Sequence, residues 1–256
     1  MTGVNDIDIL MEFLKMPPGS SDAVFAKFAK IPEAKRRPSG SESGSEQFLF
    51  IEGKRINRVL LVAHADTWWD ARYIQNNSGR NEIKPQEIYQ ENGKIKNKKG
   101  GLGADDRAGC AIIWLLKDLG HSILITDGEE CGQKGSRWLI DKNPDIKNII
   151  NDKHQFVIEL DRKNAKDFKC YSVGTDEFKK YVSDKTGYSK SDSKGRTDIC
   201  ILCDKICGVN LSIGYYGEHT KDEYLMVDEW INTLNKCREW LSEEELPLFR
   251  LNKNNA

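Results

Sequence analysis

The sequence has almost no net charge, and it lacks a long apolar run. Over its 256 residues, 39 Lys and Arg side chains nearly balance 40 Asp and Glu side chains, so the formal net charge is −1 at pH 7. This balance argues against binding that depends on attraction to nucleic acid or to an anionic membrane surface. No apolar stretch approaches the roughly 20 residues that a membrane-spanning helix needs. We therefore expect neither nucleic acid nor membrane as a partner.

A secretory signal is also missing from the amino terminus. The first residues, MTGVNDIDILMEFLK, carry acidic side chains early instead of a basic start followed by an apolar stretch. The seven cysteines are an odd number, spread over a large chain without an export signal, which favours reduced thiols. A cytoplasmic location is therefore expected.

Three of these cysteines lie close together in TDICILCDKICG. Cys200, Cys203 and Cys207 follow the i, i+3, i+7 spacing of one stripe on a helix, which we predict over 198–207. Buried cysteine packs like a small apolar side chain. A helix core is therefore favoured over a thiolate metal site.

Short apolar runs alternate with helical patterns along the chain. Helices are predicted over 6–16, 22–31, 106–120, 135–142, 175–186, 198–207 and 226–243. Strands are predicted over 46–53, 58–66, 155–161 and 208–216, with another that starts at 121 and ends in a loop at 130, and a hairpin over 86–99. Strands that alternate with helices predict a three-layer α/β/α sandwich with a mainly parallel, mixed central sheet.

The chain shows no internal repeat and no interdomain linker. Its only low-complexity stretch, 187–196, is too short to separate two domains. We therefore expect a single catalytic domain over 1–256, with residues 1–44 forming amino-terminal helices that pack on it.

Histidines and carboxylates gather where the predicted strands end. In α/β sheets, ligands bind at the carboxyl ends of the parallel strands. Five strand ends or loops each deliver an imidazole or a carboxylate, namely His64 with Asp66, Asp105 with Asp106, Glu129 with Glu130, Asp161, and Glu218 with His219. Such a set suits two divalent ions such as zinc, which need a bridging carboxylate when they lie close together.

The chain has only four histidines. His121 opens a strand and His154 follows a polar stretch, so both are expected at exposed or edge positions. His64 instead ends the apolar run Val-Leu-Leu-Val-Ala, in a strand where an unpartnered imidazole would be costly. In company with the carboxylates named above, metal ligation is the favoured interpretation of His64.

Five short motifs carry these residues: AHAD, GADDRAG, DGEECGQKGS, ELD and GEHTKDEYL, in this order. The series resembles the co-catalytic dinuclear zinc exopeptidases and amidohydrolases, a clan that includes peptidase T-type tripeptidases, single-domain aminopeptidases and aminoacylases. The resemblance implies the zinc-exopeptidase (phosphorylase/hydrolase-like) fold. Many relatives carry an inserted lid domain, but the gaps from Asp66 to Asp105 and from Asp161 to Thr197 are too short for one.

The same resemblance implies a ligand set for two zinc ions, with cobalt or manganese as alternative metals. Asp105 resembles the carboxylate that bridges the two ions. The remaining ligands would be His64 and Asp161 on one metal and Glu130 and His219 on the other. Asp66 would orient His64 through a carboxylate–imidazole contact.

Within the Glu-Glu pair, the resemblance assigns proton transfer to Glu129, which would take a proton from the attacking water and pass it to the leaving amine. Arg196, Tyr215 and Tyr216 are candidate substrate contacts, as is the tryptophan pair at 68–69. A surface position for the arginine and core or rim packing for the aromatic residues are the alternatives.

The implied activity is metal-dependent hydrolysis of amide bonds, with a zinc aminopeptidase acting on small peptides as the leading hypothesis. Deacylation of N-acyl amino acids or other small amides is an alternative. Acyl transfer of the glutaminyl-cyclase kind and non-catalytic binding on the same scaffold are two others. The complete ligand set and the presence of Glu129 favour dinuclear hydrolysis over these last two.

The adjacent aspartates of GADDRAG are expected to have different roles. Asp106 is predicted to face the backbone or Arg107, as an anion at a helix amino terminus. Relatives hold the peptide bond between such a pair in the cis form. The resemblance therefore implies a cis bond between Asp105 and Asp106, which would aim Asp105 at both ions.

Overall fold

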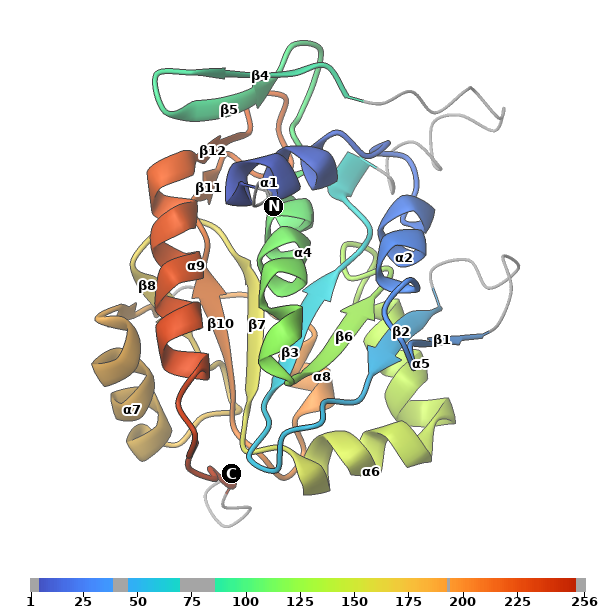
Figure 1. Cartoon of the computed structure of the whole chain (residues 1–256), viewed down its shortest axis with the longest axis vertical. Helices are drawn as coiled ribbons and strands as arrows, with labels where there is room; N and C mark the ends of the chain where they lie inside the picture. Colours follow the sequence, from blue (N-terminus) through green and yellow to red (C-terminus); the bar gives the residue numbers. More distant parts are fainter. Residues whose placement is uncertain (1–4, 39–45, 70–85, 193, 252–256) are drawn as a thin grey trace.

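The computed structural model describes residues 5–38, 46–69, 86–192 and 194–251. Positions 1–4 and 39–44 of the predicted amino-terminal segment lie outside this description, as does position 193 of the loop predicted over 187–196. An eight-stranded sheet lies at the centre (Figure 1). Across the sheet the strands follow the order β1 (Lys35–Arg37), β2 (Phe48–Ile51), β6 (Ser122–Thr126), β3 (Leu60–His64), β7 (Val157–Arg162), β10 (Gly208–Ser212), β8 (Asp167–Lys169) and β9 (Ser189–Lys190).

The four strands in the middle of this sheet are parallel. β6, β3, β7 and β10 pair in this order, whereas β2 is antiparallel to β6 and β8 is antiparallel to β10. Every position of β3, β6 and β10 is buried, as expected for parallel strands that are covered on both faces. The predicted mixed, mainly parallel sheet is confirmed.

Helices cover both faces of the sheet, which confirms the three-layer architecture (Figure 1). One face carries α1 (Asp6–Leu14), α2 (Asp22–Phe28), α4 (Ala104–Leu116) with the 3-10 turn η1 (Lys117–Leu119), α7 (Asp176–Thr186) and α9 (Val227–Leu241). The other carries α5 (Lys134–Lys142), α6 (Pro144–Lys153) and α8 (Ile199–Leu202). Because successive strand residues point to opposite faces, Leu61 packs with the first group and Leu60 with the second.

A small antiparallel sheet lies beyond the central one. Its strands follow the order β11 (Tyr215–Tyr216), β12 (Tyr224–Met226), β5 (Lys94–Asn97) and β4 (Ile88–Glu91). The predicted hairpin is confirmed, with positive φ at Asn92 and Gly93, as a tight two-residue turn requires. The strand predicted over 208–216 is wrong in its second half, because the chain turns at Gly214 (φ 90°) and then joins this small sheet.

The helix predicted over 198–207 is also too long. α8 ends at Leu202, and Cys203 already has extended backbone angles. Cys203 and Cys207 are buried, but they belong to hydrophobic clusters on opposite faces of the sheet, while Cys200 is half-buried. The prediction of one cysteine stripe on one helix is therefore wrong, although two of the three thiols do pack as apolar side chains.

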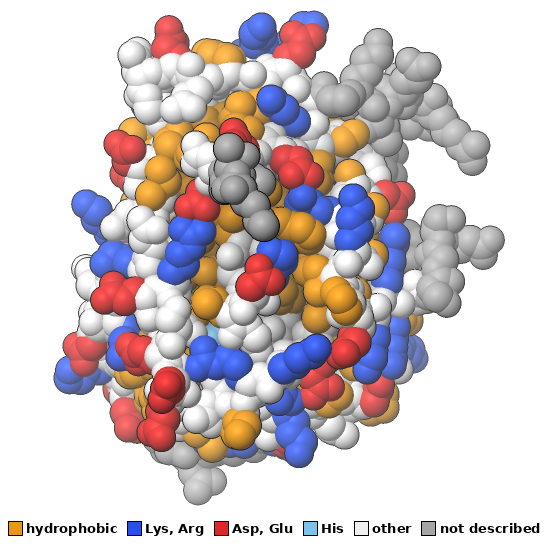
Figure 2. All heavy atoms as spheres, in the orientation of Figure 1, with side chains coloured by type: hydrophobic (Ala, Val, Ile, Leu, Met, Phe, Trp, Pro, Cys, Tyr) orange, Lys and Arg blue, Asp and Glu red, His pale blue; other side chains and the backbone are white. Residues whose placement is uncertain are grey.

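Figure 2 shows Lys and Arg side chains interspersed with Asp and Glu over one face of the molecule. This distribution agrees with the near-zero net charge of the chain. In the described part of the chain, no helix is both long and apolar enough to cross a membrane.

Candidate metal centre

The carboxyl ends of neighbouring parallel strands bring several predicted site residues together. His64 is the last residue of β3, and Asp161 lies near the end of β7. Glu129 and Glu130 follow β6, which lies on the other side of β3. This is the edge at which α/β sheets bind ligands.

Two further residues reach this edge from outside the central sheet. Asp105 lies at the start of α4, where its backbone is still non-helical (φ −78°, ψ 99°). His219 lies in the loop between β11 and β12, with a positive φ of 63°. One histidine of the cluster therefore comes from the central sheet and the other from a loop of the small sheet.

Asp105 divides its two carboxylate oxygens between these histidines. Its Oδ1 is 3.1 Å from His64 Nε2, and its Oδ2 is 3.3 Å from His219 Nε2. Each imidazole also faces a second carboxylate. His64 Nε2 lies 3.3 Å from Asp161 Oδ1, and His219 Nε2 lies 2.9 Å from Glu130 Oε2. The five residues expected as ligands thus form two groups of three that share Asp105.

Asp66 contacts His64 from the opposite side of the ring. Its Oδ1 lies 3.3 Å from His64 Nδ1, and its backbone oxygen lies 3.1 Å from the same nitrogen. The backbone N–H groups of Glu129 and Glu130 donate to the two Asp66 carboxylate oxygens, each at 3.2 Å. Asp66 therefore orients the imidazole and ties it to the loop that carries the glutamate pair.

Asp106 faces the backbone, as predicted. Its Oδ2 accepts from the backbone N–H of His64 at 3.1 Å, and its Oδ1 accepts from that of Gly109 at 3.0 Å. The peptide bond between Asp105 and Asp106 is cis, in agreement with the geometry that the resemblance implies. Donor atoms of Asp106 also lie close to those of His64 and Asp161. Because both Asp106 oxygens already accept from the backbone, Asp105 is the better placed metal ligand.

The buried carboxylates of the cluster outnumber its imidazoles. Burial and the nearby Asp105 raise the pKa of Asp161 and of Glu130 above the ordinary range. Although burial alone lowers it, Asp161 and Asp105 raise the pKa of His64 well above its ordinary value. Burial likewise lowers the pKa of His219, but its carboxylate partners raise it to about 10. A cation would relieve this repulsion, and imidazole and carboxylate donors fit zinc, so the residues present suit the metals that the sequence resemblance implies.

Glu129 lines the cavity beside these donors. Gln133 Nε2 donates to its Oε1 at 3.1 Å, which restricts the side chain. Burial and the negative charge of Asp161 raise the pKa of Glu129 well above its ordinary value. A carboxyl group that lies next to the donor set and readily takes up a proton suits a role in proton transfer.

Thr197 connects Asp161 to a second buried carboxyl group. The Thr197 hydroxyl lies 3.0 Å from Asp161 Oδ2 and 2.8 Å from Glu159 Oε1. One hydroxyl proton serves only one of these acceptors, so the other contact needs a carboxyl group that carries its own proton. Burial and the charge of Asp161 raise the pKa of Glu159 well above its ordinary value, which favours Glu159 as the carboxyl group that carries the proton. Asp161 is thereby held with its Oδ1 toward the cluster.

Glu223 is a buried carboxylate that the sequence reasoning missed. Its Oε2 accepts from the backbone N–H of Gly103 at 2.7 Å, and its Oε1 accepts from that of Asp105 at 3.3 Å. Burial raises the pKa of Glu223 to about 7. Glu223 therefore holds the backbone on which Asp105 is mounted. Its place within GEHTKDEYL, four residues after His219, is the signal that could have identified it.

The tryptophan pair packs around the cluster. Trp68 stacks on the ring of His219, with centroids 4.5 Å apart and an interplanar angle of 15°. Trp69 lies so close to Gly101 that an added Cβ would come 2.0 Å from the indole, and its Nε1 donates to Glu223 Oε2 at 3.5 Å. These contacts support the loops that carry the ligands.

A cavity of about 370 Å³ opens beside the donor set. Arg196 and Tyr215, two candidate substrate contacts, are part of its wall. Tyr216 is not among the described residues that line it, and its hydroxyl donates to Glu229 Oε2 at 2.8 Å. The cavity places an exposed cation and a buried aromatic ring next to the carboxylate cluster.

The expected exposure of His121 and His154 is wrong, because the two side chains are only 3% and 1% exposed. The neutral ring of His121 donates from Nε2 to the Leu241 carbonyl (2.9 Å) and accepts at Nδ1 from the Val59 N–H (3.2 Å). His154 Nδ1 donates to the Ile150 carbonyl at 3.1 Å. Polar neighbours in the sequence suggested exposure, but these backbone partners allow neutral imidazoles to be buried.

No protein-family model and no curated protein matches the chain, whereas solved structures match over most of its length. Aminopeptidase PepT from Bacillus cereus has a TM-score of 0.64 at 14% identity, covering 94% of this chain and 99% of that chain. A tripeptidase from Staphylococcus aureus has a TM-score of 0.65 at 12% identity, covering 93% and 98%. The TET1 peptidase of Pyrococcus horikoshii has a TM-score of 0.61 at 13% identity, covering 93% and 100%.

At these identities the likeness establishes the fold. The chain has the zinc-exopeptidase fold, as the motifs indicated, with a small additional sheet. At the ligand-binding edge of that fold it carries a buried cluster of histidine and acidic side chains, which is a candidate metal site.

Proposed function

We propose that this chain is a dinuclear metal-dependent amide hydrolase, and that it acts as an aminopeptidase on small peptides. The observation that carries the proposal is the division of the Asp105 oxygens between two histidine–carboxylate groups. A carboxylate that bridges two ions needs this arrangement, in which each oxygen faces a different set of donors. The fold shared with several peptidases supports the same reaction class.

His64 and Asp161 would hold one ion, Glu130 and His219 the other, and Asp105 both. Bound divalent metals supply Lewis acidity at a substrate carbonyl and lower the pKa of water. Zinc is the metal that best suits these donors, with cobalt and manganese as alternatives.

Glu129 is the proposed general base. Its carboxylate accepts a proton from the attacking water and returns that proton to the nitrogen of the broken amide bond. Asp66 keeps His64 in one orientation during this exchange, and Arg196 and Tyr215 shape the cavity in which the substrate lies. The work of the adjacent glutamates is thus divided, with Glu130 as a ligand and Glu129 as the proton carrier.

The test compares wild-type protein with Glu129→Gln, which keeps the size of the side chain and removes its basicity. We expect hydrolysis of aminoacyl amides to fall by at least about a hundredfold, the scale of general-base catalysis. The content of bound zinc, measured by elemental analysis, should remain at two ions per chain. Undiminished hydrolysis would rule out Glu129 as the base, and fewer than two ions at saturation would contradict the dinuclear site.

A panel of substrates, tested with zinc, cobalt or manganese, identifies the amide that is cleaved. Peptides with a free amino terminus should be cleaved in preference to N-acyl amino acids. The reverse preference would make the chain a deacylase instead of an aminopeptidase. Absence of turnover on both classes, with two metals bound, would favour a binding protein.

A further inference from the structure

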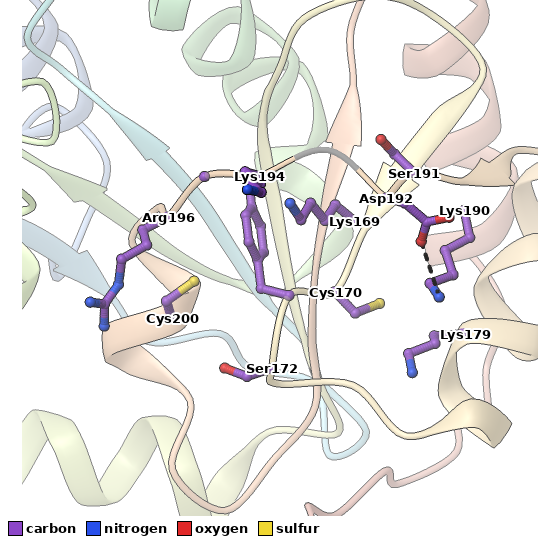
Figure 3. A pocket seen from close by; sticks show the side chains of 12 residues that line it. Lys169, Cys170, Ser172, Lys179, Lys190, Ser191, Asp192, Lys194, Arg196 and Cys200 are labelled. Carbon is purple, nitrogen blue, oxygen red and sulfur yellow. Dashed lines mark ion pairs between the residues drawn. The ribbon is translucent and has the colours of Figure 1, made fainter.

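Figure 3 shows a second cavity, of about 550 Å³. It lies next to the cavity at the metal cluster. Tyr171, Lys194 and Arg196 line both cavities, so the two have part of their walls in common. The rest of the second cavity is formed by the end of β8 and the residues after it, by α7, by β9 and the segment that follows it, and by Cys200 of α8. A ligand seated at the metal cluster could therefore extend into it.

This second cavity is strongly basic. One acidic side chain, Asp192, lines it together with five cationic ones: Lys169, Lys179, Lys190, Lys194 and Arg196. Lys190 pairs with Asp192 at 3.3 Å, as Figure 3 shows, and Lys179 pairs with the exposed Asp176 at 2.8 Å. Among the described residues, the other three cations have no ion-pair partner. The cavity therefore has a surplus of positive charge.

Lys169 is the least exposed of these five cationic residues. The residue is only 9% exposed, and its ammonium group lies over the ring of Tyr171, 4.6 Å from the ring centroid. Burial and the nearby Arg162 lower its pKa. A cavity-lining ammonium without a carboxylate partner is stabilised by an anion that binds beside it.

We propose that the basic cavity binds carboxylate groups on the leaving part of a peptide substrate. The inference rests on the proposed aminopeptidase function, because an aminopeptidase leaves only one residue on the amino-terminal side of the bond that it cleaves. The leaving part is then the only part long enough to reach a second cavity. Its terminal carboxylate and an acidic side chain would pair with two of the three cations that have no ion-pair partner, so short peptides with an acidic last residue are the expected substrates.

The test uses Leu-Gly-Glu and Leu-Gly-Gln, which differ only in the charge of the last side chain. We expect wild-type protein to favour Leu-Gly-Glu by about tenfold in kcat/KM, mainly through a lower KM. The double variant Lys169→Met, Lys194→Gln should lose this preference, and its KM for Leu-Gly-Gln should also rise, because the terminal carboxylate of that peptide uses the same cations. Lys180→Gln is the matched control, because Lys180 follows Lys179 on α7 but pairs with Asp184 away from the cavity, so its preference should remain.

Calorimetric titration with the dipeptides Gly-Glu and Gly-Gln separates this inference from the proposed function, since it needs no catalysis. Tighter binding of Gly-Glu than of Gly-Gln, lost in the double variant, would support the basic site. If neither tripeptide is hydrolysed, the proposed function is contradicted, but this binding result still stands. Hydrolysis without preference, together with equal binding of the two dipeptides, would overturn this inference alone. Tighter binding of inorganic phosphate than of Gly-Glu would also overturn it, because the cavity would then be a phosphate site.

Discussion

A histidine is buried at each end of the central sheet, and the pKa values of the two histidines are shifted in opposite directions. His64 ends β3, and His121 immediately precedes β6, the strand that pairs with β3. Both side chains are almost fully buried. The carboxylates around His64 raise its pKa well above the ordinary value, whereas burial lowers that of His121 to about 4.

The partners of each ring explain this contrast. At the carboxyl end, Asp105 and Asp161 stabilise a cation, whether that cation is a protonated imidazole or a metal ion. At the amino end, one His121 nitrogen accepts from a backbone N–H, so a proton added there would displace a hydrogen bond. Burial alone therefore says little about the function of a histidine. The charge of the groups that face it decides between a structural ring and a candidate ligand.

The largest effects are expected when the histidine at each end of the sheet is replaced in turn, which tests whether the two ends differ in function. His64→Asn should abolish amide hydrolysis and reduce the bound metal, since it removes a donor from the cluster. His121→Gln, which keeps one acceptor and one donor, should retain metal and activity. Elemental analysis and hydrolysis of an aminoacyl amide measure both effects. Equal losses in the two variants would mean that the ends do not differ in function.

The same pair of variants separates metal binding from folding. Free zinc at a hundred times its dissociation constant should raise the free energy of unfolding by about 2.7 kcal/mol for each ion bound, in wild-type protein and in His121→Gln. His64→Asn should show a much smaller increase, measured by denaturant titration with and without zinc. An undiminished increase in His64→Asn would place the stabilising metal elsewhere.

A smaller effect is expected from Glu223→Gln. This change alters the hydrogen bonds that hold the backbone of Asp105 and leaves the proposed metal ligands in place. The backbone N–H groups of Gly103 and Asp105 lose a charged acceptor, so both zinc affinity and kcat/KM should fall by about 10- to 100-fold. Asp222→Asn is the matched control, because it removes the same charge from an exposed neighbour. A loss of stability without a change in zinc affinity would reduce Glu223 to a structural residue.

The sequence pattern predicts part of the carboxyl end of the sheet well because two of its site residues follow apolar runs. His64 is the last residue of β3 and Asp161 the second-to-last residue of β7, so the positions of both follow from the strand pattern. Strands of two or three residues, such as β9 and β8, are too short to show a period, and α6 was missed as well. The motif GEHTKDEYL could have pointed to Glu223, but the backbone groups that it holds could not be predicted, because they lie about 120 residues earlier in the chain.

The smallest expected effect concerns the amino end of the sheet, where buried histidines should make the free energy of unfolding depend on pH. Burial lowers the pKa of His121 and of His154 to about 4, below the value of 6.5 expected in the unfolded chain. The unfolded state therefore binds more protons between these values, and the free energy of unfolding falls as the pH falls from 6.5 toward 4. Each histidine should contribute about 2 kcal/mol of this loss between pH 7 and pH 5.

His121→Gln should reduce the acid-induced loss by that amount, because glutamine does not titrate in this range. Denaturant titrations of wild-type and variant protein at pH 7 and pH 5 give the difference, in which the titration of the carboxylate cluster cancels. Arg55 lies beside the ring and also disfavours its protonation, so Arg55→Gln should shift the acid response in the same direction by a smaller amount. An identical pH dependence in wild-type protein and His121→Gln would show that this buried ring does not resist protonation, and the contrast between the two ends would fail.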